Sequence, residues 1–477
     1  MTEKPGRTEA GASFPAITAL SLQLSERIYL GAFLTLLVWL PLPLGSATSW
    51  GWLAVMLLLA LLNGLYINQH REYSINILVQ NRWVMGFWGL LSVWHFLLLI
   101  PFSSDLLESV RPLRNHVIFT DRNDWQALTY STQDTLLSLY RTVTYWGMFT
   151  LTLLLFRSSR RLKLLLRAFV AIGLFEILYA SLLIFIDADH SLILDLPLQN
   201  GATGTFLRQI AYGHTVFLAI CAVLGLLIIR IKPSSTGTLR QKLRRVIKYF
   251  FSKKAALRIA ALLLFGGMVM AGIYSMAWVT LIATLTTALA AYWLFSPRPK
   301  LFTTFMGSLL AANIAAVIVA TFLSDRAGPP PPPAPVTLED AQWQPATPDV
   351  MEHWVLGAGP GTAKDVEIDG LFNLPVPGVI PLAQRDTYQA VAEFGLPVSV
   401  LALVLFAWCA GHALLAMHRR RHVIFRGTAF SCVAALTGTG LLTIYESPLQ
   451  TPSNAAYVSV LLALSLVCLQ CRKYYRA

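Results

Sequence analysis

Long apolar stretches constrain the fold of this chain more than any other feature. A helix that spans the hydrocarbon core of a bilayer needs about 20 mainly apolar residues. Of the 477 residues, 56% are hydrophobic and 13% are charged, whereas a soluble domain has about 25% charged residues. Twelve candidate spans occupy residues 29–45, 51–67, 83–101, 136–156, 165–186, 209–229, 259–274, 278–296, 301–323, 395–416, 427–444 and 455–471. Because backbone polar groups must be satisfied within lipid, each span is expected to be a helix.

The sequence therefore predicts an all-α polytopic membrane protein with about twelve transmembrane helices and one long outside loop between spans nine and ten. The expected parts are a cytoplasmic tail (1–28), helices one to nine (29–323), the periplasmic loop (324–394), and helices ten to twelve with a cytoplasmic tail (395–477). A run of prolines near the start of the long loop is typical of a stiff polyproline II spacer. The ten-residue alternating segments that mark a membrane β-barrel are not seen.

The distribution of charge predicts an orientation. The net charge of +13 could indicate a nucleic-acid partner, and residues 240–258 carry a dense basic run. If the N-terminus is cytoplasmic, however, the inside segments hold 29 of the 37 Lys and Arg residues and the outside loops hold seven. Cytoplasmic loops retain basic residues, so we expect both termini on the cytoplasmic side of the membrane. The basic run then marks topology and contacts anionic lipid, and no nucleic acid is implied.

Ionisable residues at membrane depth are costly and are functional candidates by default. Glu176 lies in the fifth span, Arg141 near the outer end of the fourth, and Arg208 and His214 at the outer start of the sixth. The structural alternatives are that Arg141 and Glu176 form a buried pair and that His214 is a satisfied core histidine. The spacing of His and Cys residues predicts no metal site and no disulfide framework.

A polar segment just before the tenth span is the most informative part of the sequence. It contains Gln384, Arg385, Asp386, Tyr388 and Glu393 at the expected outer interface. Arg385 can bind phosphate, and Asp386 or Glu393 can act as a general base beside an acceptor hydroxyl. The alternative is the start of an interfacial helix with Asp386 as its N-terminal cap.

Several stretches together resemble the superfamily of O-antigen ligases and O-antigen polymerases, which build bacterial envelope glycans. Each stretch is short, and the likeness lies in their order along residues 29–416. The stretches are Pro41–Gly45 with Ser49–Gly51, Thr135–Arg141 with Thr144–Tyr145, Gly204–Phe206, Leu356–Gly361 and Asp386–Gly395.

The resemblance implies a glycosyltransferase without metal or other cofactor. Such an enzyme lies in the bacterial inner membrane and moves a glycan from an undecaprenyl diphosphate carrier to a lipid or glycan acceptor at the periplasmic face. The implied partners include other polysaccharide-assembly proteins. The implied roles are diphosphate binding by Arg141, Arg208 and Arg385, and base catalysis by Asp386 or His353. The implied acceptor or cavity residues are Glu176, His214, Gln384, Tyr388 and Glu393.

The chain departs from the family pattern in two places. Residues 384–387 read Gln-Arg-Asp-Thr where members often read His-Asn-Asp-Tyr, so the expected histidine is missing. Residues 275–277 read Ser-Met-Ala where Ser-Arg-Gly is common, so one arginine is missing. Two other functions therefore remain open: a non-catalytic subunit of a polysaccharide assembly complex, and a transporter or flippase.

Overall fold

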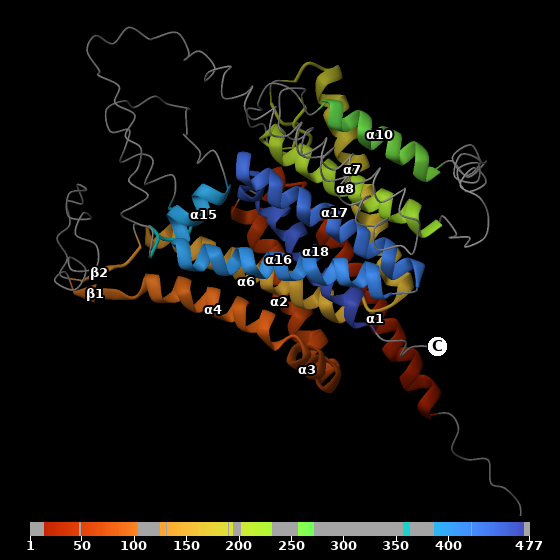
Figure 1. Ribbon diagram of the computed structural model, residues 1–477, viewed down its shortest axis with the longest axis horizontal. Helices are drawn as coiled ribbons and strands as arrows, with labels where there is room; N and C mark the ends of the chain where they lie inside the picture. The colour runs from red at the N-terminus through yellow and green to blue at the C-terminus, as the bar shows by residue number, and fades with distance from the viewer. Residues whose placement is uncertain are drawn as a thin grey trace, which may run out of the picture.

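The computed structural model of the protein is mostly helical (Figure 1). It describes residues 14–46, 49–103, 125–129, 131–188, 190–193, 202–230, 256–270, 356–362, 386–420 and 422–471. Within these ranges seven helices are long and apolar enough to cross a membrane, and large apolar side chains such as Trp83, Phe185 and Leu403 are exposed. The chain is thus a helical membrane protein, since a soluble surface would not carry so many exposed apolar side chains.

The first four helices pack along one side of the bundle. They are α1 (Phe14–Trp39), α2 (Ser49–Gln69), α3 (Arg71–Gln80) and α4 (Arg82–Leu99). The first span was expected to continue to residue 45, but α1 ends before Pro41 because proline has no N–H to continue the helix. Residues 68–82 were expected to be a loop, yet most of them form α3. Asn81 follows α3 directly and its side-chain amide donates to the Ile77 carbonyl oxygen at 2.9 Å.

The remaining elements pack around three central helices. They are α6 (Thr132–Leu155), α7 (Ser159–Phe185), α8 (Gln209–Arg230), α10 (Ala256–Met270), α15 (Asp386–Phe394), α16 (Leu396–Arg419), α17 (Val423–Tyr445) and α18 (Pro452–Gln470). The 3₁₀ turns η1 (Leu44–Ser46) and η3 (Pro448–Gln450) lie between helices, and β1 (Pro101–Ser103) pairs antiparallel with β2 (Trp125–Ala127). The candidate spans 278–296 and 301–323 lie outside the described residues, and the count of twelve stays a prediction.

The core lies among α8, α17 and α18. In the span of α18, 89% of residues are buried, against 22% in α16, which lies at the periphery. Gly225 of α8 and Gly427 of α17 let the two backbones approach, because a Cβ on Gly427 would lie 2.9 Å from the Gly225 carbonyl oxygen. Small residues at helix contacts are the usual way in which membrane helices gain van der Waals contact.

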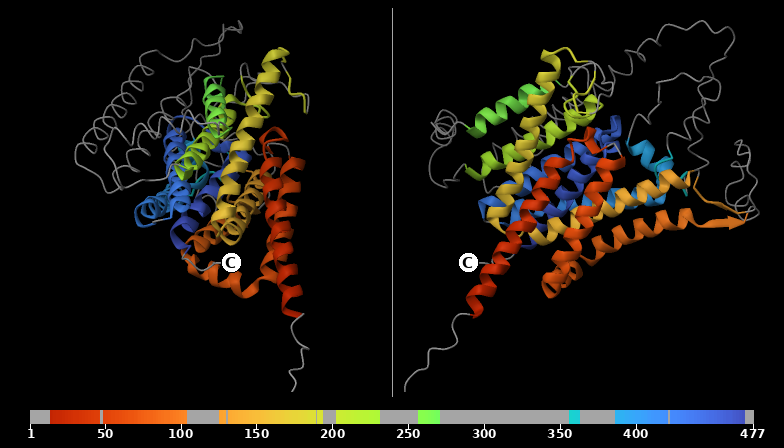
Figure 2. Two further views of the ribbon diagram at one scale, coloured as in Figure 1. Left: turned by 90° about the vertical axis from the view of Figure 1, so that its right-hand side faces the viewer. Right: turned by 180° about the vertical axis from the view of Figure 1, so that it is seen from behind.

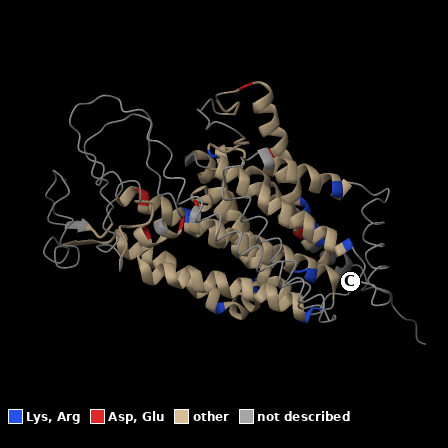
Figure 3. Cartoon of the chain, turned by 45° about the horizontal axis from the view of Figure 1, so that its top comes forward, with Lys and Arg blue, Asp and Glu red and all other residues tan. Residues whose placement is uncertain are grey.

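The two ends of the bundle differ in charge. The strands β1 and β2 and the helix α15 lie at one end, whereas α3 lies near the other and the start of α1 extends beyond it (Figures 1 and 2). Most described Lys and Arg residues lie away from α15 (Figure 3). This asymmetry is what the sequence predicts, although the orientation in the membrane stays a prediction.

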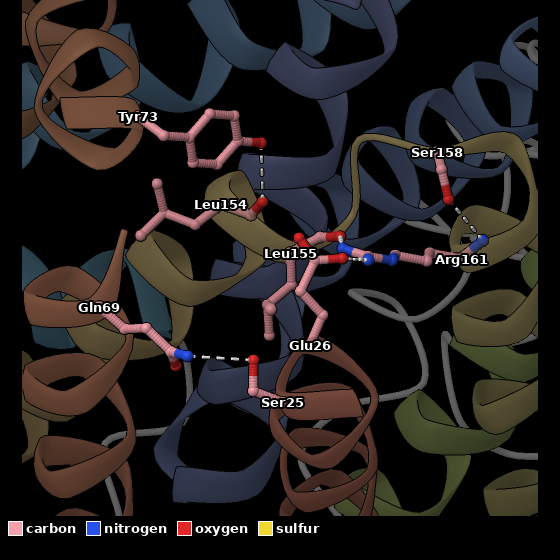
Figure 4. A network of polar contacts seen from close by, with 8 residues as sticks. All are labelled: Ser25, Glu26, Gln69, Tyr73, Leu154, Leu155, Ser158 and Arg161. Carbon is pink, nitrogen blue, oxygen red and sulfur yellow. Dashed lines mark hydrogen bonds and ion pairs between the residues drawn. The ribbon is translucent and has the colours of Figure 1, made fainter. Parts of the chain in front are cut away.

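A network of hydrogen bonds and an ion pair links the helices at the end remote from α15 (Figure 4). Arg161 pairs with Glu26 of α1 and donates from Nη1 to the Leu155 carbonyl oxygen at 3.0 Å. Tyr73 Oη donates to the Leu154 carbonyl oxygen at 3.3 Å. These donors satisfy carbonyl groups that the C-terminus of α6 leaves without helical partners.

Candidate functional site

Five segments that are distant in sequence meet at the α15 end of the bundle. We call this set the polar end and define it as residues 41–46, 203–208, 356–362, 386–394 and 446–451. Thr205 Oγ1 lies 2.8 Å from the Pro41 carbonyl oxygen, and a Cβ on Gly45 would lie 2.6 Å from Thr451 Cγ2 and 2.7 Å from Phe206 Cδ1. Four of the stretches that carry the family resemblance therefore lie in one place, joined by a turn between α17 and α18.

Glu176 holds the segment that precedes α8. Its side chain is fully buried in α7, and it accepts hydrogen bonds from the Thr205 N–H and the Thr205 hydroxyl, both at 2.8 Å. Gly204 makes this possible, because its φ is +60° and a Cβ there would lie 2.5 Å from Glu176 Oε2. The alternative of an Arg141–Glu176 pair is wrong, since both carboxyl oxygens of Glu176 bind Thr205 and no ion pair of the described residues joins Glu176 to Arg141.

Arg208 binds the turn between α17 and α18. Its Nη2 donates to the Ser447 carbonyl oxygen at 2.9 Å, and its Nη1 donates to Gln450 Oε1 at 2.9 Å and Ser447 Oγ at 3.3 Å. Burial lowers the pKa of Arg208, while the carboxyl groups of Asp386 and Glu446 raise it. The guanidinium is thus held by its own chain at the start of α8.

Asp386 binds the same turn from the other side. Its Oδ2 accepts from the Leu449 N–H at 2.7 Å, and its own N–H donates to the Glu446 carbonyl oxygen at 3.2 Å. The carboxylate was considered as a cap for its own helix, but it receives the backbone N–H of η3 instead. Burial raises the pKa of Asp386 to about 7, although the Leu449 N–H and Arg208 act in the opposite direction.

Two glutamines that sequence analysis missed connect this turn to α15. Gln450 Nε2 donates to Gln389 Oε1 at 2.6 Å, and Gln389 Nε2 donates to Glu393 Oε1 at 2.7 Å. Glu393 is a buried carboxyl with an exposed fraction of 5%. A sequence signal for Gln450 did exist, because residues 446–454 are a polar, proline-containing interruption between two apolar spans.

The glycine-rich segment 356–362 caps the C-terminus of α15. The N–H of Ala358 donates to the Ala392 carbonyl oxygen at 2.7 Å, and the N–H of Gly359 donates to the Glu393 carbonyl oxygen at 3.1 Å. Gly357 and Gly359 have φ values of +72° and +115°, and a Cβ on either would overlap Glu393 or Thr129. Residues 356–362 therefore also contact the segment that precedes α6, where Gly359 lies against Thr129.

Of the remaining predicted residues, the structure describes three and leaves three outside the described ranges. His214 is a buried histidine that is satisfied at one ring nitrogen only: Nε2 lies 2.9 Å from Thr439 Oγ1, and Nδ1 has no hydrogen-bond partner among the described residues. Arg141 lies in α6, and no hydrogen bond joins it to Arg208 or Asp386 within the described ranges. Tyr388 lies within α15. Three predicted residues lie outside the described ranges: His353, Gln384 and Arg385.

The described side chains show no metal-binding cluster of three or more His, Cys, Asp or Glu residues. No protein-family model matches this chain, and a search of curated proteins finds no match. The polar end, where Arg208 and Asp386 bind the same turn, is the best candidate site in the part of the chain that the structure describes.

Proposed function

We propose that the protein is a membrane glycosyltransferase that moves a glycan from an undecaprenyl diphosphate carrier to an acceptor hydroxyl at the membrane surface. The observation that carries this proposal is that four separate family-like stretches meet at the polar end, where Arg208 and Asp386 bind the same turn. A cation beside a carboxyl group at one end of a membrane bundle suits a substrate whose diphosphate lies at headgroup level and whose acceptor must lose a proton.

The proposed reaction is a displacement at the anomeric carbon of the carried glycan. The acceptor oxygen forms a bond to that carbon, and the bond from the carbon to the diphosphate oxygen breaks. The acceptor proton passes to the Asp386 carboxylate, and the lipid diphosphate leaves as an anion beside Arg208. Donors that are already oriented toward the developing charge need little reorganisation during the reaction.

Reconstitution of the full-length protein tests this proposal. Proteoliposomes would receive a synthetic oligosaccharide on a polyprenyl diphosphate together with candidate lipid or glycan acceptors. We expect release of free polyprenyl diphosphate with transfer of the glycan. Movement of the intact donor between leaflets, without cleavage of the glycan–phosphate bond, would instead identify a transporter.

A non-catalytic role in a polysaccharide assembly complex is the second candidate. It is favoured by the engagement of Arg208, whose guanidinium already donates to Ser447 and Gln450. On this hypothesis the protein binds the lipid-linked glycan but never consumes it. Binding measured on the same proteoliposomes, without turnover over any acceptor tested, would decide for this role.

The ionisation of Asp386 predicts a pH profile for transfer. A general base works when it is deprotonated, so the rate is expected to rise with pH to a plateau, with a midpoint of about 7. Asp386→Asn should lower the rate and remove this rise. An unchanged profile in Asp386→Asn would show that another group is the base.

The raised pKa of Asp386 predicts that stability falls as pH rises, whereas the transfer rate is expected to increase. Since the pKa of Asp386 is raised above its ordinary value of 3.8, the folded state holds a proton that the unfolded state releases. The contribution of Asp386 to the free energy of unfolding is therefore greatest at low pH and falls as pH rises from about 4 to about 7. Thermal unfolding of Asp386→Asn should lack this part of the pH dependence.

A further inference from the structure

A continuous chain of side-chain hydrogen bonds runs from Arg208 to Glu393. Arg208 Nη1 donates to Gln450 Oε1 at 2.9 Å, Gln450 Nε2 to Gln389 Oε1 at 2.6 Å, and Gln389 Nε2 to Glu393 Oε1 at 2.7 Å. Its members come from three separate parts of the sequence: the start of α8, the turn η3 and the helix α15. We call these four residues the glutamine chain.

The charged residues at its ends give the glutamine chain a single direction. A guanidinium can only donate, and a carboxylate can only accept. Each glutamine must therefore turn its oxygen toward Arg208 and its nitrogen toward Glu393. If one amide reversed, two oxygens or two N–H groups would face each other and a hydrogen bond would be lost.

The acidic end of the chain lies at the docking site of the glycine-rich segment. Four carbonyl groups near the C-terminus of α15 accept hydrogen bonds: Ala390 from the Ser399 hydroxyl, Val391 from the Gly395 N–H, Ala392 from the Ala358 N–H and Glu393 from the Gly359 N–H. Two of these four donors belong to residues 356–362. Glu393 therefore carries both the side chain that ends the glutamine chain and one of the two backbone carbonyl groups that bind residues 356–362.

We propose that Gln389 and Gln450 are positioning residues, whose one-directional chain couples docking of residues 356–362 to the orientation of Arg208. The coupling itself rests only on the contacts described above. Its role in catalysis rests on the proposed function, in which Arg208 binds the donor diphosphate. Binding of the diphosphate would then change the docking of residues 356–362.

Reversal of the chain provides the sharpest test. In Gln450→Glu, Arg208 keeps an acceptor, but Gln389 must donate to the new carboxylate and its oxygen then faces Glu393. Adding Glu393→Gln supplies the missing donor, so that the chain is complete again, with the hydrogen bonds between residues 450, 389 and 393 in the opposite direction. The double variant also has the same net charge as the wild-type protein.

Hydrogen–deuterium exchange of the Ala358 and Gly359 amides measures docking without any substrate. We compare four full-length proteins: wild type, Gln450→Glu, Glu393→Gln and the double variant. In the wild-type background, Gln450→Glu is expected to accelerate exchange about tenfold, the effect of losing one hydrogen bond to a charged group. In the Glu393→Gln background the same change should alter exchange by less than about twofold. Peptides from α3, at the opposite end, report whether each variant is folded.

Equal acceleration in both backgrounds, or none in either, would overturn the inference. A transfer assay on the same four proteins separates it from the proposed function. If exchange depends on background as expected and transfer is absent from all four proteins, the coupling stands and the proposed function fails. If both occur, transfer should fall in Gln450→Glu and recover in the double variant.

Discussion

Replacing Arg208 by alanine is expected to reduce glycan transfer by about 10²- to 10³-fold. This is the usual effect of removing one preorganised donor from a site where negative charge develops. Arg208→Lys should retain part of the activity, because lysine keeps the charge but cannot reproduce the planar fork that contacts Ser447 and Gln450. The measurement is release of polyprenyl diphosphate by proteoliposomes at saturating donor.

A matched control for Arg208→Ala is Arg71→Ala. Arg71 is an exposed arginine in α3, far from the polar end, and its loss should leave transfer unchanged. Arg208 also holds the turn between α17 and α18, so both variants need a thermal unfolding curve. Turnover at the wild-type rate by a folded Arg208→Ala protein would remove Arg208 from the diphosphate site.

Replacing Gly204 by alanine should lower the free energy of unfolding by about 3 kcal/mol or more. Left-handed backbone costs about 1–2 kcal/mol in a residue with a Cβ. The new methyl group would also displace Glu176, whose Oε2 would lie 2.5 Å away, and weaken the two Thr205 hydrogen bonds to a buried carboxylate. Breaking a hydrogen bond of a buried charged group costs a further amount of about 1–3 kcal/mol.

Gly64→Ala is the control for this change. Gly64 lies in the middle of α2 and a Cβ there would meet no atom within 4 Å. Alanine in a helix is favoured over glycine by about 0.5–1 kcal/mol, so this variant should be slightly more stable. Similar unfolding temperatures for the two variants in detergent would show that the Gly204 turn does not anchor the fold.

Prediction from sequence was successful for helices and less so for their ends. Apolar stretches identified the segments that became α2, α4, α7, α8, α16, α17 and α18, because a membrane helix satisfies its own backbone within one continuous stretch. The end of α1 was misplaced because Pro41 and Pro43 interrupt an otherwise apolar run. The helix α3 was missed because it is polar, and polarity between two spans was interpreted as a loop.

The candidate site was predicted in part. Arg208 and Asp386 were both selected from sequence as ionisable residues at an expected membrane interface, and both lie at the polar end. Their common partner, the turn at residues 446–450, was not selected. Neither were Gln389 and Gln450, since an uncharged amide beside a membrane span has no feature that distinguishes it from a surface residue.

The sequence alone determined that this chain forms apolar helices and that its charge is unevenly distributed, because both properties depend on neighbouring residues. Only the tertiary structure decided which polar groups meet. Arg208 and Ser447 are 239 residues apart, and Asp386 and Leu449 are 63 apart, yet both pairs meet at the turn between α17 and α18. Such contacts depend on how α8, α15, α17 and α18 pack, and helix packing is set by side-chain shape over the whole bundle. The guanidinium of Arg208 and the carboxyl group of Asp386 thus acquire a shared site only when the bundle is assembled.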